Sequence, residues 1–433
     1  MSRSLLLAGG RVIDPAEGTD DVLDVLVEDG RIAAVARGIA GPDGVPRVSA
    51  EGLVVAPGLI DVHVHLRQPG AEHKETIRSG ARAAAAGGFT TVWAMPNTDP
   101  PLDDPAAVGF VREEARRWAR MGEGGARVSP VGAASRGLAG RRMTEIGGLV
   151  EAGAVAVTDD GHPIHDPSLM RRLLEYTQSF DIPVLQHAED MALSAGGVMN
   201  EGAVATALGL RGIPNASEAT VVARDIYLAE LTGGHVHIQH VSTREAVDLI
   251  RCAREREVRV SGEATPHHLT LTEEAVRGYR TEAKMNPPLR SEADRLGVRQ
   301  GVIDGVIECI ATDHAPHHYE EKEREFDEAP FGIVGLETAL AVCIGELVTP
   351  GDLTLSQLID RMSTGPARTM GIDGGTLRPG SPADIVVFDP QGRWTVDSAG
   401  FRSRSRNTPF EGWEVKGRVR RTIVGGETRY ERR

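Results

Sequence analysis

Cysteine is scarce in this chain, and its three residues lie far apart. Cys252, Cys309 and Cys343 form no CxxC pair. So few isolated cysteines argue against a disulfide framework and suit a reducing compartment. We therefore expect a cytoplasmic protein.

Excess positive charge and long hydrophobic runs are also missing. The chain has 48 Lys and Arg against 62 Asp and Glu, a net charge of −14, with no basic stripe, which argues against nucleic-acid binding. The apolar run LLLA near the start is too short for a signal peptide. No apolar run approaches the roughly 18 residues of a membrane span, so we expect no membrane association.

What is present is the composition of a globular protein, and its 433 residues suffice for a large domain and a smaller one. Both ends, residues 4–36 and 382–430, hold short alternating β-like runs. Eight β-rich runs followed by helical stretches lie between them: 53–66, 89–97, 126–135, 154–160, 182–189, 235–242, 258–268 and 306–316. This pattern predicts an α/β protein: a (β/α)₈ barrel with a small β-sandwich domain built from both chain ends. We place the domains at residues 1–54, 55–372 and 373–433.

Three of the helical stretches carry clear end signals. The stretch 73–88 ends in glycine, and the stretch 166–180 opens with an aspartate cap followed by proline. In the stretch 242–257, Ser242 and Glu245 have the spacing of a capping box.

The motif DVHVHLRQPG (61–70) places polar side chains on one face of an apolar strand. Side chains alternate along a strand, so His63, His65 and Arg67 point the same way. Both imidazoles could then bind one metal ion. The alternative is a pair of hydrogen-bonded core histidines, and the HxH pattern followed by Arg67 favours the metal.

Barrel active sites lie at the carboxyl ends of the strands, and several predicted strands end in metal-ligand residue types. These are His63 and His65, Asp159 and Asp160, His187, His240, and Asp313 beside His314, with Asn97 at the end of the second strand. Imidazole and carboxylate are ligands of ions such as Zn²⁺. Strand parity predicts that one of the Asp159–Asp160 pair reaches the metal and that His314 faces away.

Four other histidines are not counted as ligands. His235 and His237 lie on the face opposite His240 by parity, so they are predicted to pack or to form hydrogen bonds. His267 and His268 end the seventh strand and could support the site from outside. The charged run 317–332 is open to two interpretations, a solvated surface loop or a lid over the barrel mouth.

These motifs together resemble the amidohydrolase superfamily and, within it, the bacterial type I dihydroorotases. The resemblance covers nearly the whole chain. It rests on GLIDVHVHLRQPG (58–70), AMPNTDP (94–100), TDDGHP (158–163), QHAED (186–190), HVST (240–243), TPHHL (265–269), KMNPPLR (284–290) and ATDHAPH (311–317).

The resemblance implies a role for each matching residue. His63 and His65 would bind one metal, Asp160 would bridge two, and His187 and His240 would bind the second. Asp313 would contact the first metal and act as the catalytic base. The residues expected to hold the substrate are Arg67, Asn97 and His317 at its carboxylate, with Asn286, Phe331 and Gly332 at its ring.

The implied reaction is the reversible cyclisation of N-carbamoyl-L-aspartate to L-dihydroorotate in pyrimidine biosynthesis, through a zinc-activated hydroxide and an aspartate acid/base. Two zinc ions per subunit, a homo-oligomer and a complex with aspartate transcarbamoylase fit the same resemblance. Two rivals remain, a hydantoinase or allantoinase and a non-catalytic scaffold subunit. Many such relatives bridge their metals with a carboxylated lysine, and AVAVTDDG (154–161) has none. This favours dihydroorotase, and the complete ligand set argues against a scaffold.

Overall fold

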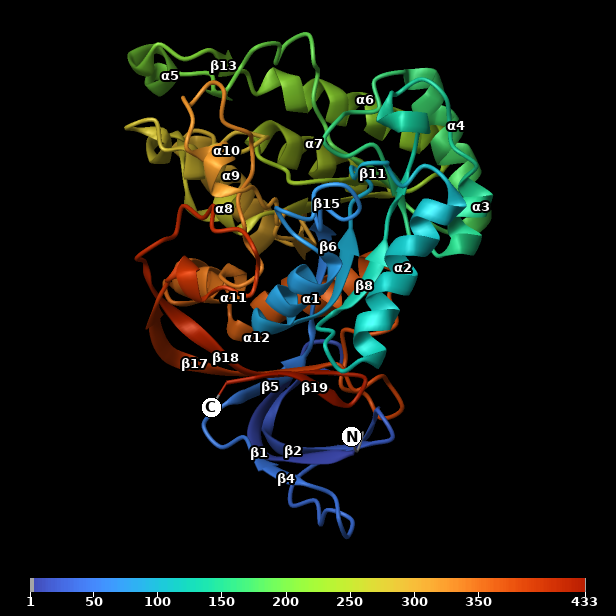
Figure 1. Cartoon of the computed structure of the whole chain (residues 1–433), viewed down its shortest axis with the longest axis vertical. Helices are drawn as coiled ribbons and strands as arrows, with labels where there is room; N and C mark the ends of the chain where they lie inside the picture. Colours follow the sequence, from blue (N-terminus) through green and yellow to red (C-terminus); the bar gives the residue numbers. More distant parts are fainter. Residues whose placement is uncertain (1–3, 433) are drawn as a thin grey trace.

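The structure is a computed structural model that describes residues 4–432. The two ends of the chain share one β-rich region at the bottom of Figure 1, and the segments between them form the larger region above it. The strands of the lower region are β1 (Leu5–Asp14), β2 (Thr19–Glu28), β3 (Arg31–Ala36), β4 (Arg47–Ser49), β5 (Val54–Pro57), β17 (Ile385–Thr395), β18 (Glu414–Val424) and β19 (Glu427–Glu431).

These strands pair in the order β19-β18-β17-β5-β1-β2-β3, with β4 beside β1. The antiparallel pairing of β17 with β5 joins the two chain ends, which confirms that one small domain is built from both. The sheet closes over its own apolar core, which includes Leu7, Val25 and Val55 from the N-terminal strands and Ile385 and Ile423 from the C-terminal ones.

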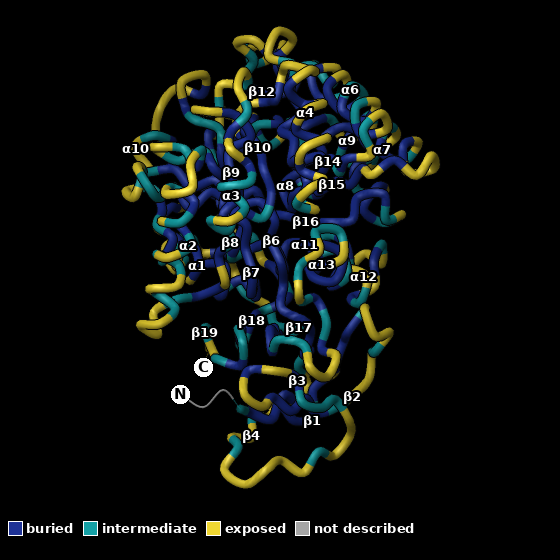
Figure 2. Tube along the Cα trace, turned by 90° about the vertical axis from the view of Figure 1, so that its right-hand side faces the viewer, coloured by how far each residue is buried: buried dark blue, intermediate teal, exposed yellow. Residues whose placement is uncertain are grey.

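The central strands follow the predicted barrel order. They are β6 (Leu59–Val64), β7 (Phe89–Ala94), β8 (Arg127–Pro130) continued by β9 (Gly132–Ala133), β10 (Val157–Thr158), β11 (Val184–Gln186), β14 (Val236–Ile238), β15 (Val260–Ala264) and β16 (Cys309–Ile310). Neighbours pair in parallel, and a bridge from Val64 to His314 links the first strand to the segment after the eighth. All eight predicted barrel strands are therefore present, and they form the buried centre of the molecule (Figure 2).

Helices surround these strands. They are α1 (Ile77–Ala86), α2 (Pro105–Arg120), α3 (Ile146–Ala152), α4 (Pro167–Thr177), α5 (Ala203–Leu208), α6 (Ala216–Thr232), α7 (Arg244–Glu255), α8 (Pro266–Thr270), α9 (Glu292–Ile303), α10 (Tyr319–Lys322), α11 (Ala339–Cys343), α12 (Leu355–Ile359) and α13 (Gly365–Met370). A two-stranded sheet of β12 (Met199–Asn200) and β13 (Gly212–Ile213) lies beside α5. No helix within residues 4–432 is both long and apolar enough to cross a membrane.

The predicted helix ends are confirmed with one correction. Asp166 caps α4 and Pro167 is its first residue, as the sequence indicates. The capping box of Ser242 and Glu245 is wrong, because α7 is capped by Thr243, whose side chain accepts a hydrogen bond from the backbone N–H of Ala246. Ser242 is instead engaged by the buried carboxylate of Glu218.

The lower sheet packs directly on the barrel. Phe388 of β17 is fully buried, and with Val386 and Val419 it joins the apolar core of the barrel rather than that of the sheet. Arg127 on β8 pairs with Asp384 next to β17, at 2.8 Å. The connection between β17 and β18, residues 396–413, leaves the sheet and runs up toward the loop that carries α10 (Figure 1).

Candidate metal centre and active site

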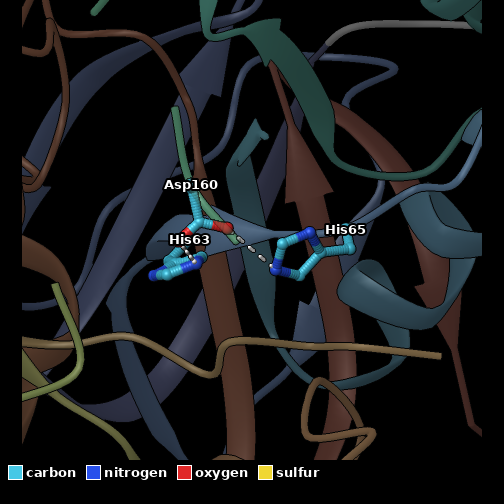
Figure 3. A group of neighbouring side chains, drawn as sticks. All are labelled: His63, His65 and Asp160. Carbon is cyan, nitrogen blue, oxygen red and sulfur yellow. Dashed lines mark ion pairs between the residues drawn. The ribbon is translucent and has the colours of Figure 1, made fainter. Parts of the chain in front are cut away.

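Two histidines point into the barrel from the end of β6. His63 lies on the strand and His65 follows it, where its backbone N–H donates to the carbonyl of His314. Each ring turns its Nε2 atom toward Asp160, at 3.4 Å in both cases (Figure 3). The predicted alternation of the HxH motif thus brings both imidazoles to one carboxylate.

The carboxylate of Asp160 lies between two pairs of histidines. Its Oδ1 atom is 3.4 Å from Nε2 of His63 and 3.7 Å from both Nδ1 of His187 and Nε2 of His240. Its Oδ2 atom faces His65. One carboxylate therefore lies within 3.7 Å of a ring nitrogen of each of the four histidines.

Asp313 completes the cluster on the side of the first pair. Its Oδ1 atom is 3.0 Å from Nε2 of His65 and 3.5 Å from Nε2 of His63. All six predicted ligands are therefore buried at one place, and their ligand atoms fall into three overlapping groups: His63, His65 and Asp160; His63, His240 and Asp313; and Asp160, His187 and His240.

The donor set fits a divalent metal. Oδ1 of Asp160 is buried and has no hydrogen-bond partner among the described residues, which is costly for a carboxylate unless a cation satisfies it. The ring nitrogens of His187 and His240 that face it lie 2.8 Å apart. Four imidazoles and two carboxylates are the ligand types of borderline ions, so this cluster suits a metal site.

The cluster shifts its own pKa values strongly. Burial would raise the pKa of Asp160, but the positive charge of His63 and the nearby ring nitrogens of His187 and His240 hold it well below its usual range. Burial would lower the pKa of His187, yet the nearby carboxylate of Asp160 and the hydrogen-bonded carboxylate of Glu189 raise it to about 10. The pKa of Asp313 is lowered in the same way, because His63 and His65 outweigh its burial.

Outer carboxylates and an amide orient the ligands. Glu263 on β15 accepts from Nδ1 of His63 at 2.5 Å, and Glu189 contacts Nε2 of His187 at 2.9 Å. Oδ1 of Asn97 is 2.8 Å from Nδ1 of His65. Such contacts fix the tautomer that turns the other ring nitrogen toward a metal.

Glu263 and Glu189 were not singled out by sequence reasoning. The sequence does contain a sign of the role of Glu263, because a glutamate inside an otherwise apolar strand needs a buried partner. It also binds the backbone N–H of His240 and Nε2 of His237, both at 3.2 Å. Glu263 therefore connects ligands from both halves of the cluster.

Three site residues have backbone conformations that are rare outside glycine. The φ angles of Arg67, His240 and Asp313 are 59°, 34° and 45°. Each residue follows the end of a barrel strand, where the left-handed turn directs the side chain. Such strain is found where a functional geometry requires it.

Arg67 and His317 lie together beside the metal cluster. The guanidinium of Arg67 donates to the carbonyl of Pro316 at 3.2 Å and lies 3.4 Å from Nε2 of His317. No carboxylate within residues 4–432 pairs with it at ion-pair distance. Burial and the positive charges of Arg67, Lys74 and Lys322 lower the pKa of His317 to about 2, so this imidazole is neutral.

The predicted ring-contact residues lie next to Glu189 and His317. Asn286 donates its side-chain N–H to Glu189 at 2.9 Å. The carbonyl of Phe331 accepts from Nε2 of His317 at 2.8 Å, and the N–H of Gly332 donates to Lys284 at 2.9 Å. A Cβ atom at Gly332 would lie 2.7 Å from both the ring of His317 and the carbonyl of Ala315, so only glycine lets the chain pass here.

The other polar residues at the strand ends lie where the alternation of side chains along a strand predicts. Asp159 turns away from the cluster and accepts from the N–H of Ser135 at 2.8 Å, while His314 lies 3.3 Å from Glu75. His237 is bonded to Ser261 and Glu263. The run 317–332 is partly held by the protein, since Lys322 and Phe326 are buried, and its role as a lid stays a prediction.

Comparison with known proteins shows the family of this chain. A family model described as Dihydro-orotase-like matches residues 52–246, and one described as Amidohydrolase family matches residues 333–430. A dihydroorotase of Geobacter metallireducens is 53% identical over 99% of this chain and 100% of its own length. A dihydroorotase of Syntrophotalea carbinolica is 52% identical over 98% of this chain and 99% of its own.

Solved structures share the fold at lower identity. The L-hydantoinase (dihydropyrimidinase) from Arthrobacter aurescens superposes with a TM-score of 0.88 at 25% identity, covering 100% of this chain and 96% of its own. A D-hydantoinase (dihydropyrimidinase) from Thermus sp. gives a TM-score of 0.81 at 26% identity, covering 99% and 95%.

The chain is a metal-dependent cyclic amidohydrolase, as its barrel, its small sheet and its buried cluster of histidines and carboxylates indicate. The identity to curated relatives extends over nearly the whole chain and over nearly the whole of each relative. The chain belongs to the dihydroorotase family.

Proposed function

We propose that this enzyme interconverts N-carbamoyl-L-aspartate and L-dihydroorotate, with loss or uptake of water, in the biosynthesis of pyrimidine nucleotides such as UMP. The family assignment supports the reaction. The observation that carries the choice of substrate is the guanidinium of Arg67, which lies beside the metal cluster without a carboxylate partner among residues 4–432 and is therefore available to an anionic substrate.

We assign the metals as two zinc ions. His63, His65, Asp160 and Asp313 would hold one ion, and Asp160, His187 and His240 the other. Bound divalent ions at such a site polarise a carbonyl group and lower the pKa of a coordinated water to about 7. The position of Asp160 between the two histidine pairs supports two ions rather than one.

Asp313 is the proposed general acid and base. Its lowered pKa keeps it ionised at neutral pH, so it can accept a proton. In ring opening it takes the proton of the attacking water and passes it to the departing ring nitrogen, and ring closure reverses both transfers. Its burial next to His63 and His65 keeps bulk water away from this proton.

The substrate carboxylate is assigned to Arg67, Asn97 and His317. The planar fork of Arg67 suits a carboxylate. Because Oδ1 of Asn97 is engaged by His65, its N–H group is left to donate to the substrate. Asn286 and the backbone at Phe331 and Gly332 are assigned to the ring.

Hydrolysis of L-dihydroorotate tests this proposal directly. The loss of ultraviolet absorbance as the ring opens is followed with purified enzyme, and the metal content of the same sample is assayed. We expect turnover that stops with a chelator, returns with Zn²⁺, and falls by about 10²–10⁴-fold in Asp313→Asn, the range for losing a general base.

Folded, metal-loaded protein that leaves dihydroorotate intact would refute the substrate assignment. Hydantoin and allantoin, offered under the same conditions, then distinguish a hydantoinase or allantoinase from a non-catalytic scaffold. A homo-oligomer and a complex with aspartate transcarbamoylase stay predictions, which sedimentation of the protein alone and mixed with that partner would test.

A further inference from the structure

A short extended segment from the C-terminal part of the chain lies across the barrel loops. Residues 403–407, here called the strap, alternate in burial: Ser403, Ser405 and Asn407 are buried, and the two arginines between them are exposed. This segment belongs to the connection between β17 and β18, which rises away from the sheet (Figure 1). The alternation means that one face of the strap is committed to contacts with the barrel.

One half of the strap binds the loop that follows β6. The hydroxyl of Ser403 donates to Glu75 at 2.5 Å, and the backbone N–H of Arg404 donates to the same carboxylate at 3.3 Å. The hydroxyl of Ser405 donates to the carbonyl of Lys74 at 2.8 Å. This loop also carries Arg67, so the strap is attached to the segment that presents the guanidinium.

The other half binds the loop that follows β16. The side-chain N–H group of Asn407 donates to the carbonyls of Ala315 and Gly332, at 2.9 and 3.0 Å. Its side-chain oxygen accepts from the N–H of His317 at 3.1 Å, and its own carbonyl accepts from the N–H of Val334 at 3.0 Å. One buried residue thus joins the beginning and the end of the loop from 315 to 334.

The chemistry of Asn407 suits this place closely. Its amide offers two N–H donors and one acceptor at once, whereas aspartate offers no donor when ionised and serine offers one. The two donors span the carbonyls of Ala315 and Gly332, which belong to the same loop as His317. Loss of the Asn407 side chain would remove the partner of the Ala315 carbonyl and of the His317 N–H, and leaving buried backbone groups unpaired costs more than the bonds themselves contribute.

We propose that Asn407 is a positioning residue for substrate binding, and that the strap sets the distance between Arg67 on one loop and His317 with Gly332 on the other. The proposal rests on the function proposed above, because these are the residues assigned to the substrate carboxylate and ring. The hydrogen bonds of Asn407 run to His317, Ala315, Gly332 and Val334 and to none of the proposed metal ligands, so its effect is expected on substrate binding rather than on metal content.

The test compares Asn407→Ala with Arg404→Ala, whose exposed side chain lies on the same strap. For Asn407→Ala we expect the KM for L-dihydroorotate to rise about tenfold, equivalent to about 1.4 kcal/mol, with kcat within about twofold and with unchanged zinc content. Hydrogen exchange should increase in peptides covering 314–335 and stay unchanged in the barrel strands. Arg404→Ala should match the wild type in every measurement.

A purely structural strap predicts a different result. In that case Asn407→Ala would lower melting temperature and active fraction together, with KM and the exchange of 314–335 unchanged, and the proposal would be wrong. If Asn407→Ala does not fold, Ser405→Ala is the second variant, because it removes a single hydrogen bond from the strap. A rise in KM and in hydrogen exchange near Lys74 would then support the proposal. Wild-type values of both would contradict it. If the wild type leaves dihydroorotate intact, the proposed function fails, while the exchange data still decide whether the strap orders the loop.

Discussion

The carboxylate of Glu263 lies 2.5 Å from Nδ1 of His63, on the opposite side of the imidazole from Asp160. A carboxylate in this position makes the ring a stronger metal ligand and holds its orientation. The same glutamate binds the backbone of His240, so it supports ligands assigned to both ions.

Replacing Glu263 by glutamine should therefore weaken metal binding. We expect Glu263→Gln to lower zinc affinity by about 10–100-fold, the usual cost of losing such an outer contact. Zinc retained after dialysis against a graded metal buffer measures this. Glu308→Gln is the matched control, since Glu308 is also buried but pairs with Arg254 at 2.7 Å. Equal zinc retention in both variants would contradict the assigned role of Glu263.

Substitutions at Asn97 should affect substrate binding and metal binding to different extents. Asn97→Asp keeps an acceptor for Nδ1 of His65, but it places a negative charge where the substrate carboxylate is assigned. We expect normal zinc content with a KM raised about tenfold or more, because like charges at a binding site repel. Asn97→Ala should lose both functions. A normal KM in Asn97→Asp would remove Asn97 from the substrate site.

Glu337 should make stability depend on pH. Burial raises its pKa from 4.5 to about 7, against the opposing hydrogen bonds from the N–H groups of Ser403 and Arg402. Between these values the folded state holds more protons than the unfolded state, so this group's contribution to stability is lost as pH rises from 4.5 through 7. Glu337→Gln should flatten that part of the profile. Urea midpoints at pH 5 and pH 8 measure it, and an unchanged difference between them would contradict the prediction.

Phe388 should be important for the stability of the joined domains. It lies on β17 but is buried in the core of the barrel, so its removal opens a cavity between barrel and sheet. We expect Phe388→Ala to reduce the free energy of unfolding by about 3–5 kcal/mol. Val22→Ala, at an exposed position of β2, should change it by less than about 0.5 kcal/mol. Similar urea midpoints for the two variants would show that the sheet does not support the barrel.

Sequence reasoning predicted the parts of the site that depend on local pattern. His63 and His65 follow from strand alternation, and the rule that barrel sites lie at strand ends points to Asp313 and to one of Asp159 and Asp160. The choice of Asp160 came from the family resemblance. Both rules use only the immediate neighbours of a residue. They therefore predicted the metal-facing side chains without knowledge of which strands are adjacent.

The residues that sequence reasoning missed act across the fold. Glu263 matters because the barrel brings β15 next to His63, 200 residues away in the chain. Asn407 lies in a segment with the composition of a surface loop, and its contacts with His317 and Gly332 exist only after β17 joins β5. At the start of α7, the adjacent residues Ser242 and Thr243 could each cap the helix. Thr243 is the cap, because the hydroxyl of Ser242 is bound to the buried Glu218.

The placement of Asp160 between the two histidine pairs has a consequence for how the site is assembled. A carboxylated lysine forms its bridging group by taking up carbon dioxide, so a site of that kind depends on the dissolved gas. Here the carboxylate is encoded in the polypeptide and is complete once the chain has folded. Assembly of this enzyme from apoprotein and zinc should therefore proceed equally well in degassed, bicarbonate-free buffer.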